Sequence, residues 1–333
     1  MSANSKIEWC DHTFNPWEGC QKVGPGCDHC YAEARNARFA GGQAINWGAG
    51  APRRRTTEAS WRMPLKWNAN ACWFVQCGIC GWRGESKGAI CGGCHGCDTQ
   101  PARPRVFCAS LADVFDNAVD PGWRADLFEL IAATPNLDWL LLTKRIGNVN
   151  GMLADIRHGN DPDLSVLDMM PLPNVWIGAT ITSQAEAERD IPKLLAVPAA
   201  KRFLSMEPLL GPVDLTQLLH QPCLHAHLAG TDPDTGTWEC CKACDYTGIS
   251  DDLGIDWVIV GGESGPNARP MHPDWARSLR DQCVAAGVPF LFKQRLPEQR
   301  PQELRGLSRC RPLDSPCFLS PSILFTRSRH GNH

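Results

Sequence analysis

Three cysteines stand close together near the beginning of the chain, in the segment GCQKVGPGCDHCYAEARNARF (19–39). They are Cys20, Cys27 and Cys30. The glycines and the proline between them permit tight turns, so the three sulfurs can converge on one centre. The residues YAEARNARF predict a helix, and the N-terminus of a helix stabilises the negative charge of thiolates. Three thiolates are one ligand short of a closed tetrahedral metal site.

Two kinds of metal centre fit this spacing. A zinc ion would need a fourth ligand, for which the candidates are His29, Cys10 and His12. A [4Fe–4S] cluster takes one thiolate per iron, so three cysteines leave one iron open to a substrate or cofactor. Cysteines that only fill space in the core are the third interpretation.

A second group of cysteines lies in the segment 72–97, CWFVQCGICGWRGESKGAICGGCHGC. Two Cys-x2-Cys pairs stand ten residues apart in it, a spacing typical of a structural zinc site. The four cysteines of these pairs are Cys77, Cys80, Cys91 and Cys94. Three further residues could replace one of the four, namely Cys72, Cys97 and His95.

The segment 223–246, CLHAHLAGTDPDTGTWECCKACDY, repeats part of this pattern. Its CKACDYTG has the same form as CGICGWRG, so Cys241 and Cys244 predict one half of a second zinc site. The candidates for the other half are Cys223, His225 and His227, with Cys240 as a rival. Segments so rich in glycine and cysteine bury little apolar surface, so bound metal would supply their free energy of folding. Unliganded surface thiols are the alternative for both inserts.

The composition bounds the class of protein. The chain has 333 residues and is 43% hydrophobic, enough for one large domain or two medium ones. A net charge of −3 argues against a protein held to nucleic acid by its overall charge. Without an apolar run of about 18 residues or a secretory signal, we expect a cytoplasmic protein with no membrane partner. Its 18 clustered cysteines then favour metal binding over disulfides.

Short apolar runs that alternate with helix-like segments predict an α/β fold with a parallel sheet. The runs are 105–110, 138–143, 175–181, 202–206, 256–262 and 289–294. With one more strand near the N-terminus and no Gly-rich dinucleotide turn, we expect a partial or complete parallel (β/α) barrel of about six to seven strands. This domain would span 1–294, interrupted by two cysteine-rich zinc-binding inserts, and a loosely ordered tail would follow over 295–333.

Polar residues follow most of these strands. The carboxyl ends of parallel strands converge on one rim, where the active sites of barrels lie. The candidates for a shared site are Ser110, Asp113, Lys144, Arg145, Thr180, Glu207 and Glu263. The alternative is that every strand must end in something polar, without a common function.

The opening segment IEWCDHTFNPWEGCQKVGPGCDHCYAE resembles the start of a phage-associated protein family of long-unassigned function. That family is recognised by a three-cysteine motif and is regarded as similar to radical S-adenosylmethionine enzymes. The similarity continues through CASLADVFD, LLLTKR, VWIGATI, FLSMEPLLGP, WVIVGGESGPNARPM and VPFLFKQ. The better-known radical enzymes use a Cys-x3-Cys-x2-Cys loop, whereas the first gap here is six residues, as in this family.

The resemblance implies a [4Fe–4S] cluster held by Cys20, Cys27 and Cys30, with S-adenosylmethionine bound to the open iron. Reductive cleavage of the sulfonium would give a 5′-deoxyadenosyl radical that abstracts hydrogen from a substrate. An electron donor such as flavodoxin would supply the electron. The protein itself would position the reactants and exclude water.

Under that interpretation the rim residues become ligands. Glu207 and Glu263 would bind the ammonium group or the ribose hydroxyls of the cofactor. Lys144 and Arg145 would bind its carboxylate or a substrate phosphate. Further cofactor-binding candidates are Ser110, Asp113 and Thr180. Alternatively, either glutamate pairs structurally with Lys144 or Lys293 across the rim.

Nucleic acid is the expected substrate class, for example a base to be hypermodified in phage DNA. The zinc inserts and the basic run 53–55 fit such a substrate, and three tryptophans in the inserts could stack on bases, namely Trp73, Trp82 and Trp238. Packing of each tryptophan against its own zinc knuckle is the alternative.

Two rival functions remain from the sequence. The first is a non-catalytic zinc-ribbon protein that binds nucleic acid through its metal-stabilised inserts. The second is a metal-dependent nuclease or lyase that uses Asp113, Glu207 and His272. Neither rival has a motif as distinctive as the opening segment.

Overall fold

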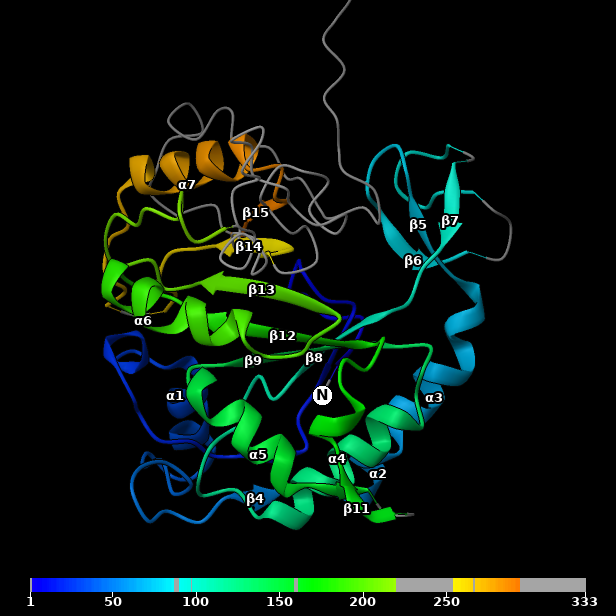
Figure 1. The fold of residues 1–333 in the computed structure, drawn as a ribbon, viewed down its shortest axis with the longest axis vertical. Helices are drawn as coiled ribbons and strands as arrows, with labels where there is room; N and C mark the ends of the chain where they lie inside the picture. The colour runs from blue at the N-terminus through cyan, green and yellow to red at the C-terminus, as the bar shows by residue number, and fades with distance from the viewer. Residues whose placement is uncertain are drawn as a thin grey trace, which may run out of the picture.

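The computed structural model describes residues 2–86, 90–96, 98–158, 161–219, 254–265 and 267–293. Its centre is an eight-stranded sheet in the order β1-β2-β8-β9-β12-β13-β14-β15 (Figure 1). The strands are β1 (Ser2–Ala3), β2 (His12–Phe14), β8 (Arg105–Cys108), β9 (Asp138–Thr143), β12 (Val175–Thr180), β13 (Lys201–Met206), β14 (Trp257–Val260) and β15 (Phe290–Phe292). Neighbouring strands from β2 to β15 are parallel, and β1 is antiparallel to β2. The seven parallel strands curl into a half-barrel, which confirms the predicted α/β fold with a partial barrel.

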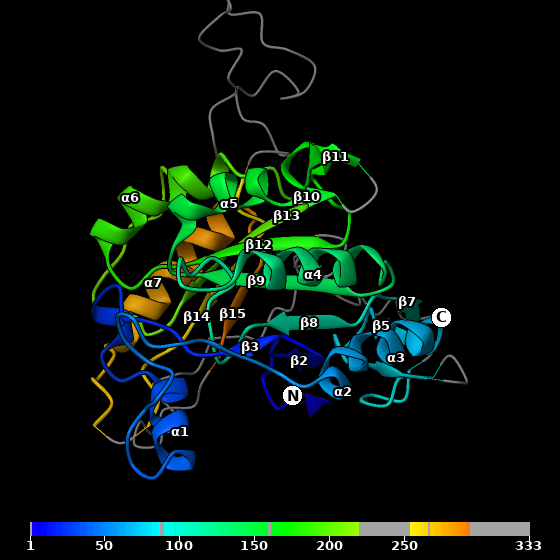
Figure 2. The same ribbon diagram turned by 90° about the horizontal axis from the view of Figure 1, so that it is seen from below.

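Helices cover the outer face of the half-barrel (Figure 2). They are α4 (Pro121–Ala132), α5 (Val149–Asp155), α6 (Gln184–Leu195) and α7 (Pro273–Ala285). Helix α4 begins at a proline, and the Asp120 carboxylate before it accepts a hydrogen bond from the backbone N–H of Gly122 at 2.7 Å. Ser183 caps α6 through a bond from the N–H of Glu186. Such caps explain why the helices begin where they do.

Smaller elements lie between the strands of the main sheet. Between β2 and β8 these are β3 (Trp17–Glu18), α1 (Tyr31–Phe39), β4 (Arg54–Arg55), α2 (Glu58–Trp61), α3 (Met63–Asn70), β5 (Phe74–Cys77), β6 (Arg83–Glu85) and β7 (Thr99–Pro101). Before β12 there are β10 (Arg157–His158) and β11 (Asp161–Ser165). Short 3-10 turns occur at Pro25–Cys27, Ala71–Trp73, Ile146–Asn148 and Leu167–Met169. Helix α1 coincides with the predicted YAEARNARF helix.

Side chains along the parallel strands alternate between two apolar layers, because successive residues of a strand point to opposite faces. One layer packs beneath the helices and includes Leu141, Ile177 and Leu204. The other fills the inside of the half-barrel and includes Trp176 and Phe203. Because both faces are buried, the strands appear in the sequence as continuous apolar runs.

Aromatic side chains close the inside of the half-barrel where the parallel strands begin. The Arg105 guanidinium lies 5.0 Å from the ring centroid of Trp176 and 5.2 Å from that of Trp257. Trp9, from the N-terminal segment, packs on Phe107 with 4.4 Å between ring centroids. This aromatic floor leaves open space at the other end, where the strands finish.

The two ends of the half-barrel carry different attachments. Figures 1 and 2 place α1 at the end to which β8 and β13 point, and the small sheet β6-β5-β7 at the opposite end. Within the described ranges, no helix combines the length and the apolar character needed to cross a bilayer.

Gly178 in β12 lies under the ring of Phe203 in the neighbouring strand. A Cβ at Gly178 would come within 2.4 Å of that ring. We expect Gly178→Ala to lower the free energy of unfolding by about 1–3 kcal/mol, because the overpacked ring must leave its rotamer or push the backbone aside. Urea unfolding measures this change.

Gly151→Ala in α5 is the matched control. No atom lies within 4 Å of a Cβ at Gly151, and alanine favours a helix over glycine. The control should therefore be neutral or stabilising. Equal destabilisation by both substitutions would show that Gly178 is not a packing constraint.

Candidate functional site

A cavity of about 360 Å³ opens where the parallel strands finish. This volume lies within the range of about 300–1,000 Å³ that is usual for small-molecule sites. The cysteines that line it are Cys20, Cys27 and Cys30. The rim residues that line it are Ser110, Asp113, Lys144, Arg145, Thr180, Glu207 and Glu263. The structure therefore brings all the residues predicted for the main site to one cavity.

The loop that carries the three cysteines lies tightly against the rim. A Cβ at Gly26 would come 2.6 Å from Cγ2 of Thr182, so only glycine fits this approach without a shift. Pro25–Cys27 form one 3-10 turn, and Cys30 is the N-cap residue of α1. Each cysteine is thus held by a different local structure around the same cavity.

The spacing of the three sulfurs can be compared with that of a zinc site. Among the described residues, these sulfurs do not form a group that lies within 4.8 Å of one another. Sulfurs on one tetrahedral zinc ion stand about 3.8 Å apart, because each Zn–S bond is about 2.3 Å. In a [4Fe–4S] cluster each thiolate binds its own iron, so the sulfurs stand farther apart. In the described structure the three sulfurs are therefore not drawn together as they would be on one zinc ion.

Arg145 holds the Cys20 side of the loop. Its guanidinium donates to the carbonyl oxygen of Gln21 at 2.8 Å and to Cys20 Sγ at 3.5 Å. It also contacts Asp113 Oδ2 at 3.2 Å and Asp116 Oδ1 at 3.6 Å. The side chains of Arg145, Asp113 and Asp116 are all at most 9% exposed, so this is a buried ionic network.

Both carboxylate oxygens of Asp113 accept hydrogen bonds within this network. Its carboxylate accepts hydrogen bonds from Thr143 Oγ1 at 2.8 Å, from the backbone N–H of Phe115 at 2.9 Å and from that of Lys144 at 3.0 Å. The geometry therefore makes Asp113 and Arg145 partners of each other and of the loop. The prediction that they bind cofactor or substrate groups finds no support in these contacts.

The thiol of Cys20 titrates far above neutral pH in this setting. Burial raises the pKa of Cys20 to about 11, and the negative charge of Asp113 adds to the shift while Arg145 opposes it. The thiol therefore stays protonated at neutral pH unless a bound metal displaces its proton.

Arg269 holds the other side of the loop. Its guanidinium donates to the carbonyl oxygen of Pro25 at 2.8 Å and to Asp28 Oδ2 at 3.1 Å. It binds Glu263 through two nitrogens, at 3.0 Å and 2.5 Å. His29 Nδ1 lies 2.7 Å from Glu263 Oε2. Glu263 and Arg269 therefore form a clamp on the segment between Cys20 and α1.

The clamp keeps Glu263 ionised. Burial alone would raise its pKa, but hydrogen bonds from Arg269 and His29 outweigh burial and lower the pKa of Glu263 to about 2. The Glu263 side chain is 5% exposed, and its described partners are Arg269 and His29. It therefore acts on the loop, and the sequence-based role as a cofactor ligand stays a prediction without a contact that favours it.

Glu207 pairs with Lys293, which is one of the two lysines that the sequence analysis named as structural partners. Its Oε2 lies 2.6 Å from Nζ of Lys293 across the cavity wall. Glu263 pairs with Arg269 instead of Lys144 or Lys293. Ser110 shares hydrogen bonds with the side-chain amide of Asn15 at 3.1 and 3.2 Å, so its hydroxyl is also engaged.

Two of the polar groups that line the cavity, Lys144 Nζ and Thr180 Oγ1, remain available for a ligand. Within the described part of the chain, Lys144 Nζ has no hydrogen-bond or ion-pair partner, and its side chain is half-buried. The Oγ1 atom of Thr180 is buried and also lacks a partner among the described residues. Leaving a buried hydroxyl unpaired costs about 1–3 kcal/mol, so a ligand that bonds to it would recover that energy.

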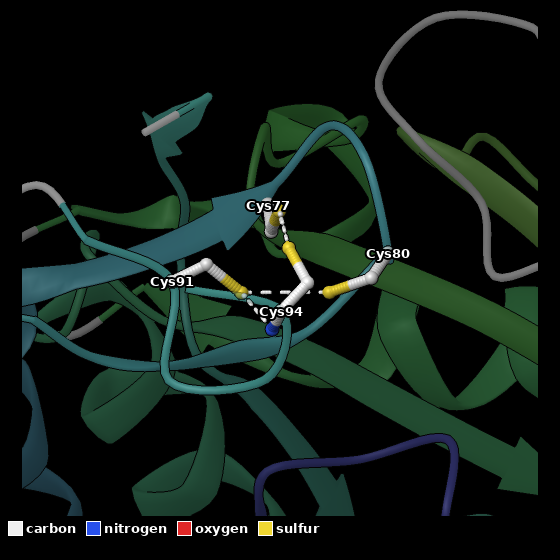
Figure 3. A group of neighbouring side chains, drawn as sticks. All are labelled: Cys77, Cys80, Cys91 and Cys94. Atoms are coloured by element: carbon white, nitrogen blue, oxygen red, sulfur yellow. Dashed lines mark hydrogen bonds between the residues drawn. The ribbon is translucent and has the colours of Figure 1, made fainter. Parts of the chain in front are cut away.

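Four other cysteines form a compact group on the small sheet, as Figure 3 shows. They are Cys77, Cys80, Cys91 and Cys94, and their sulfurs lie within 4.8 Å of one another. The sulfurs of Cys77 and Cys94 are 3.7 Å apart and those of Cys80 and Cys91 are 3.4 Å apart. These spacings match those of a tetrahedral zinc site, about 3.8 Å. The prediction that this quartet can bind a metal is confirmed.

The backbone around Cys91 favours a thiolate. The N–H groups of Gly93 and Cys94 donate to Cys91 Sγ at 3.2 and 3.3 Å. Burial would raise the pKa of Cys91, but these bonds lower it to about 6. The thiol of Cys72 is exposed and stands outside the quartet.

Trp82 and Arg83 fix the small sheet in place. A Cβ at Gly92 would come within 2.7 Å of the Trp82 ring, which therefore covers its own zinc knuckle. Arg83 donates to Asp11 Oδ2 at 3.2 Å and to the carbonyl oxygen of Arg103 at 2.6 Å. Trp82 thus has the packing role, whereas Trp73 is half exposed and does not line the cavity.

Some predicted site residues do not join these sites. The second cysteine group lies outside the described residues, and its members are Cys223, His225, Cys241 and Cys244. His272 is 60% exposed and caps α7 by accepting a bond from the N–H of Asp274 at 3.2 Å. It does not line the cavity with Asp113 and Glu207, so the constellation proposed for a nuclease is not assembled.

The sequence analysis missed Arg269. Its partners on the loop are more than 240 residues away along the chain, so no spacing connects them. The signal available was an arginine shortly after Glu263 in a loop that also contains glycine, proline and asparagine, which is a weak one.

A family model matches most of this chain. Residues 4–308 match the model of a family described as "Protein of unknown function (DUF5131)". The chain belongs to the DUF5131 family. The matched range includes the three-cysteine loop, both arginines that hold it and the Cys77 quartet. No curated protein and no solved structure matches this DUF5131 chain.

We expect this DUF5131 protein to hold zinc at the quartet. Removing the metal with a chelator should increase the exposure of Trp82 and shift its fluorescence to longer wavelength, because the knuckle beneath the ring loses its cross-link. Cys94→Ser should lose about one zinc per chain, measured by metal analysis. Cys72→Ala is the matched control and should keep the zinc. Full zinc content in Cys94→Ser would contradict the assignment.

We expect Glu263→Gln to loosen the cysteine loop. The substitution removes a charged partner of Arg269 and should lower the free energy of unfolding at neutral pH by roughly 2 kcal/mol. A carboxylate with a lowered pKa stabilises the fold above its unfolded pKa of about 4.3 and loses that contribution as the pH falls.

The difference in stability between wild type and Glu263→Gln should therefore shrink as the pH falls from about 4 towards about 2. Urea unfolding of both proteins at each pH measures it. Since the other acid-sensitive groups are common to both proteins, they cancel in the difference. A difference that stays constant over this range would refute the ionised clamp.

Proposed function

We propose that this DUF5131 protein is a radical S-adenosylmethionine enzyme. In this proposal Cys20, Cys27 and Cys30 hold a [4Fe–4S] cluster. One observation carries it: the three cysteines share a single cavity at the rim of a parallel half-barrel with two unpaired polar groups. When bound there and reduced by an external electron donor, the cluster and S-adenosylmethionine would supply radical chemistry for removing a hydrogen atom from the substrate.

The unpaired groups would bind the cofactor. Lys144 offers a positive charge for a carboxylate, and the Thr180 hydroxyl offers a hydrogen bond to a polar group. Glu207 faces the same space, and its carboxylate can accept a hydrogen bond from an ammonium group beside its contact with Lys293. Arg145 and Arg269 would position the cysteine loop instead of contacting the reactants.

The floor of the cavity would exclude water from the reaction. Trp9, Phe107 and Leu142 line it and belong to or pack against the inner apolar layer. An apolar wall limits quenching of a reactive species by solvent and strengthens the polar contacts at the rim. An apolar floor below a polar rim suits a reaction in which the protein orients the cofactor and the substrate.

The proposed substrate class is a nucleobase or nucleic acid, and the proposed electron donor is a flavodoxin-like protein in the cytoplasm. All described cysteines are free, as expected in a reducing compartment. The exposed Trp73 directly precedes β5 and the half-buried Trp82 directly precedes β6, and the small sheet that contains these strands lies at the other end of the half-barrel. A substrate in the cavity therefore would not be stacked by these two tryptophans.

Anaerobic reconstitution with iron and sulfide tests the proposal. The wild type should gain the visible absorption of an iron–sulfur cluster, and after reduction with dithionite it should convert S-adenosylmethionine to 5′-deoxyadenosine, detected by mass spectrometry. Cys27→Ala should lose both properties, because one iron loses its ligand. Cys72→Ala should keep both.

The alternative function is a non-catalytic zinc-ribbon protein that binds nucleic acid. The Cys77 quartet favours it, because such a site folds a small module without catalysis. Purified protein with zinc at Cys20, Cys27 and Cys30 and no iron after reconstitution would support this alternative and contradict the enzyme.

A further inference from the structure

Arg145 donates a hydrogen bond to a sulfur of the cysteine loop. Among the described residues, Cys20 is the one member of the three whose sulfur accepts a hydrogen bond from a charged group, at 3.5 Å from Arg145 Nη1. Arg269 also holds the loop. Its guanidinium donates to the carbonyl oxygen of Pro25 and to the carboxylates of Asp28 and Glu263, and within the described part of the chain it does not contact a sulfur.

The surroundings of Arg145 keep its charge and direction fixed. Its side chain is 9% exposed, and Asp113 and Asp116 hold the guanidinium from one side. Asp116 is itself held by Arg53 at 2.8 Å, with both side chains at most 3% exposed. A bond from a fixed cation to a ligand thiolate acts on any metal centre that the thiolate holds.

We propose that Arg145 is a positioning residue that raises the reduction potential of the iron–sulfur cluster through Cys20, and that Asp113 limits this rise. The inference rests on the proposed function. One-electron reduction adds negative charge to a cluster and its sulfurs, so an N–H donor with positive charge stabilises the reduced form more than the oxidised form. The Asp113 carboxylate, which contacts the same guanidinium, opposes this effect.

Redox titration of the reconstituted protein tests the inference, with the reduced cluster followed by electron paramagnetic resonance. The reductant is dithionite, which supplies the single electron. Arg145→Gln removes the charge and should make reduction about tenfold less favourable, which is a shift of about 59 mV to lower potential for a one-electron couple. Arg145→Lys keeps the charge and should recover part of the shift.

Arg269→Gln is the matched control. It loosens the same loop without removing a bond to sulfur, so it should lower the iron content while the remaining cluster keeps the wild-type potential. Equal potentials in Arg145→Gln and wild type, or equal shifts in Arg145→Gln and Arg269→Gln, would overturn the inference.

Asp113→Asn gives an independent measurement if Arg145→Gln does not retain a cluster. It removes the opposing charge and should move the potential upward, opposite to Arg145→Gln, and a downward or absent shift would overturn the inference. A wild type that binds no cluster would refute the proposed function and this inference together. A wild type with a cluster whose potential ignores both substitutions would refute the inference alone.

Discussion

The cysteine loop stays on the rim because two buried or half-buried guanidinium groups hold it from opposite sides. Most residues of the loop between Cys20 and Cys30 are partly or fully exposed, so apolar burial contributes little there. Arg145 binds a backbone carbonyl near its start, and Arg269 binds the carbonyl of Pro25 at its middle. A carboxylate from the rim fixes each guanidinium, Asp113 for the first and Glu263 for the second. The position of all three sulfurs depends on these two ion pairs.

The rest of the fold supplies a rigid base for those pairs. Both faces of the half-barrel are packed, and the aromatic side chains inside it fill the end where the strands begin. Space for a ligand therefore remains beside the cysteine loop, at the end where the strands finish. The Cys77 quartet lies on a small sheet at the far end, so a metal bound there and the proposed cluster would serve separate parts of the molecule.

The sequence predicted the sheet well because each parallel strand is buried on both faces and stands out as an apolar run. The Cys77 quartet was also predictable, since its four ligands come from one short segment. The roles of the rim charges were not. Asp113 and Arg145, which the sequence predicts as ligands, bind each other, and Arg269 contacts a loop 241 residues away. Ion pairs between residues far apart in the sequence form only where the fold brings the strand ends together. A single sequence does not show which strand ends are neighbours.

The central claim is that three cysteines hold a cluster with one iron open to the cofactor. Mössbauer spectroscopy of the anaerobically reconstituted protein, recorded with and without S-adenosylmethionine, tests this claim most directly. If the claim is right, one iron of the cluster should change its signal when S-adenosylmethionine binds, because it gains ligands that the other irons lack. Irons that all respond alike, or a loop that holds zinc in place of iron, would contradict it.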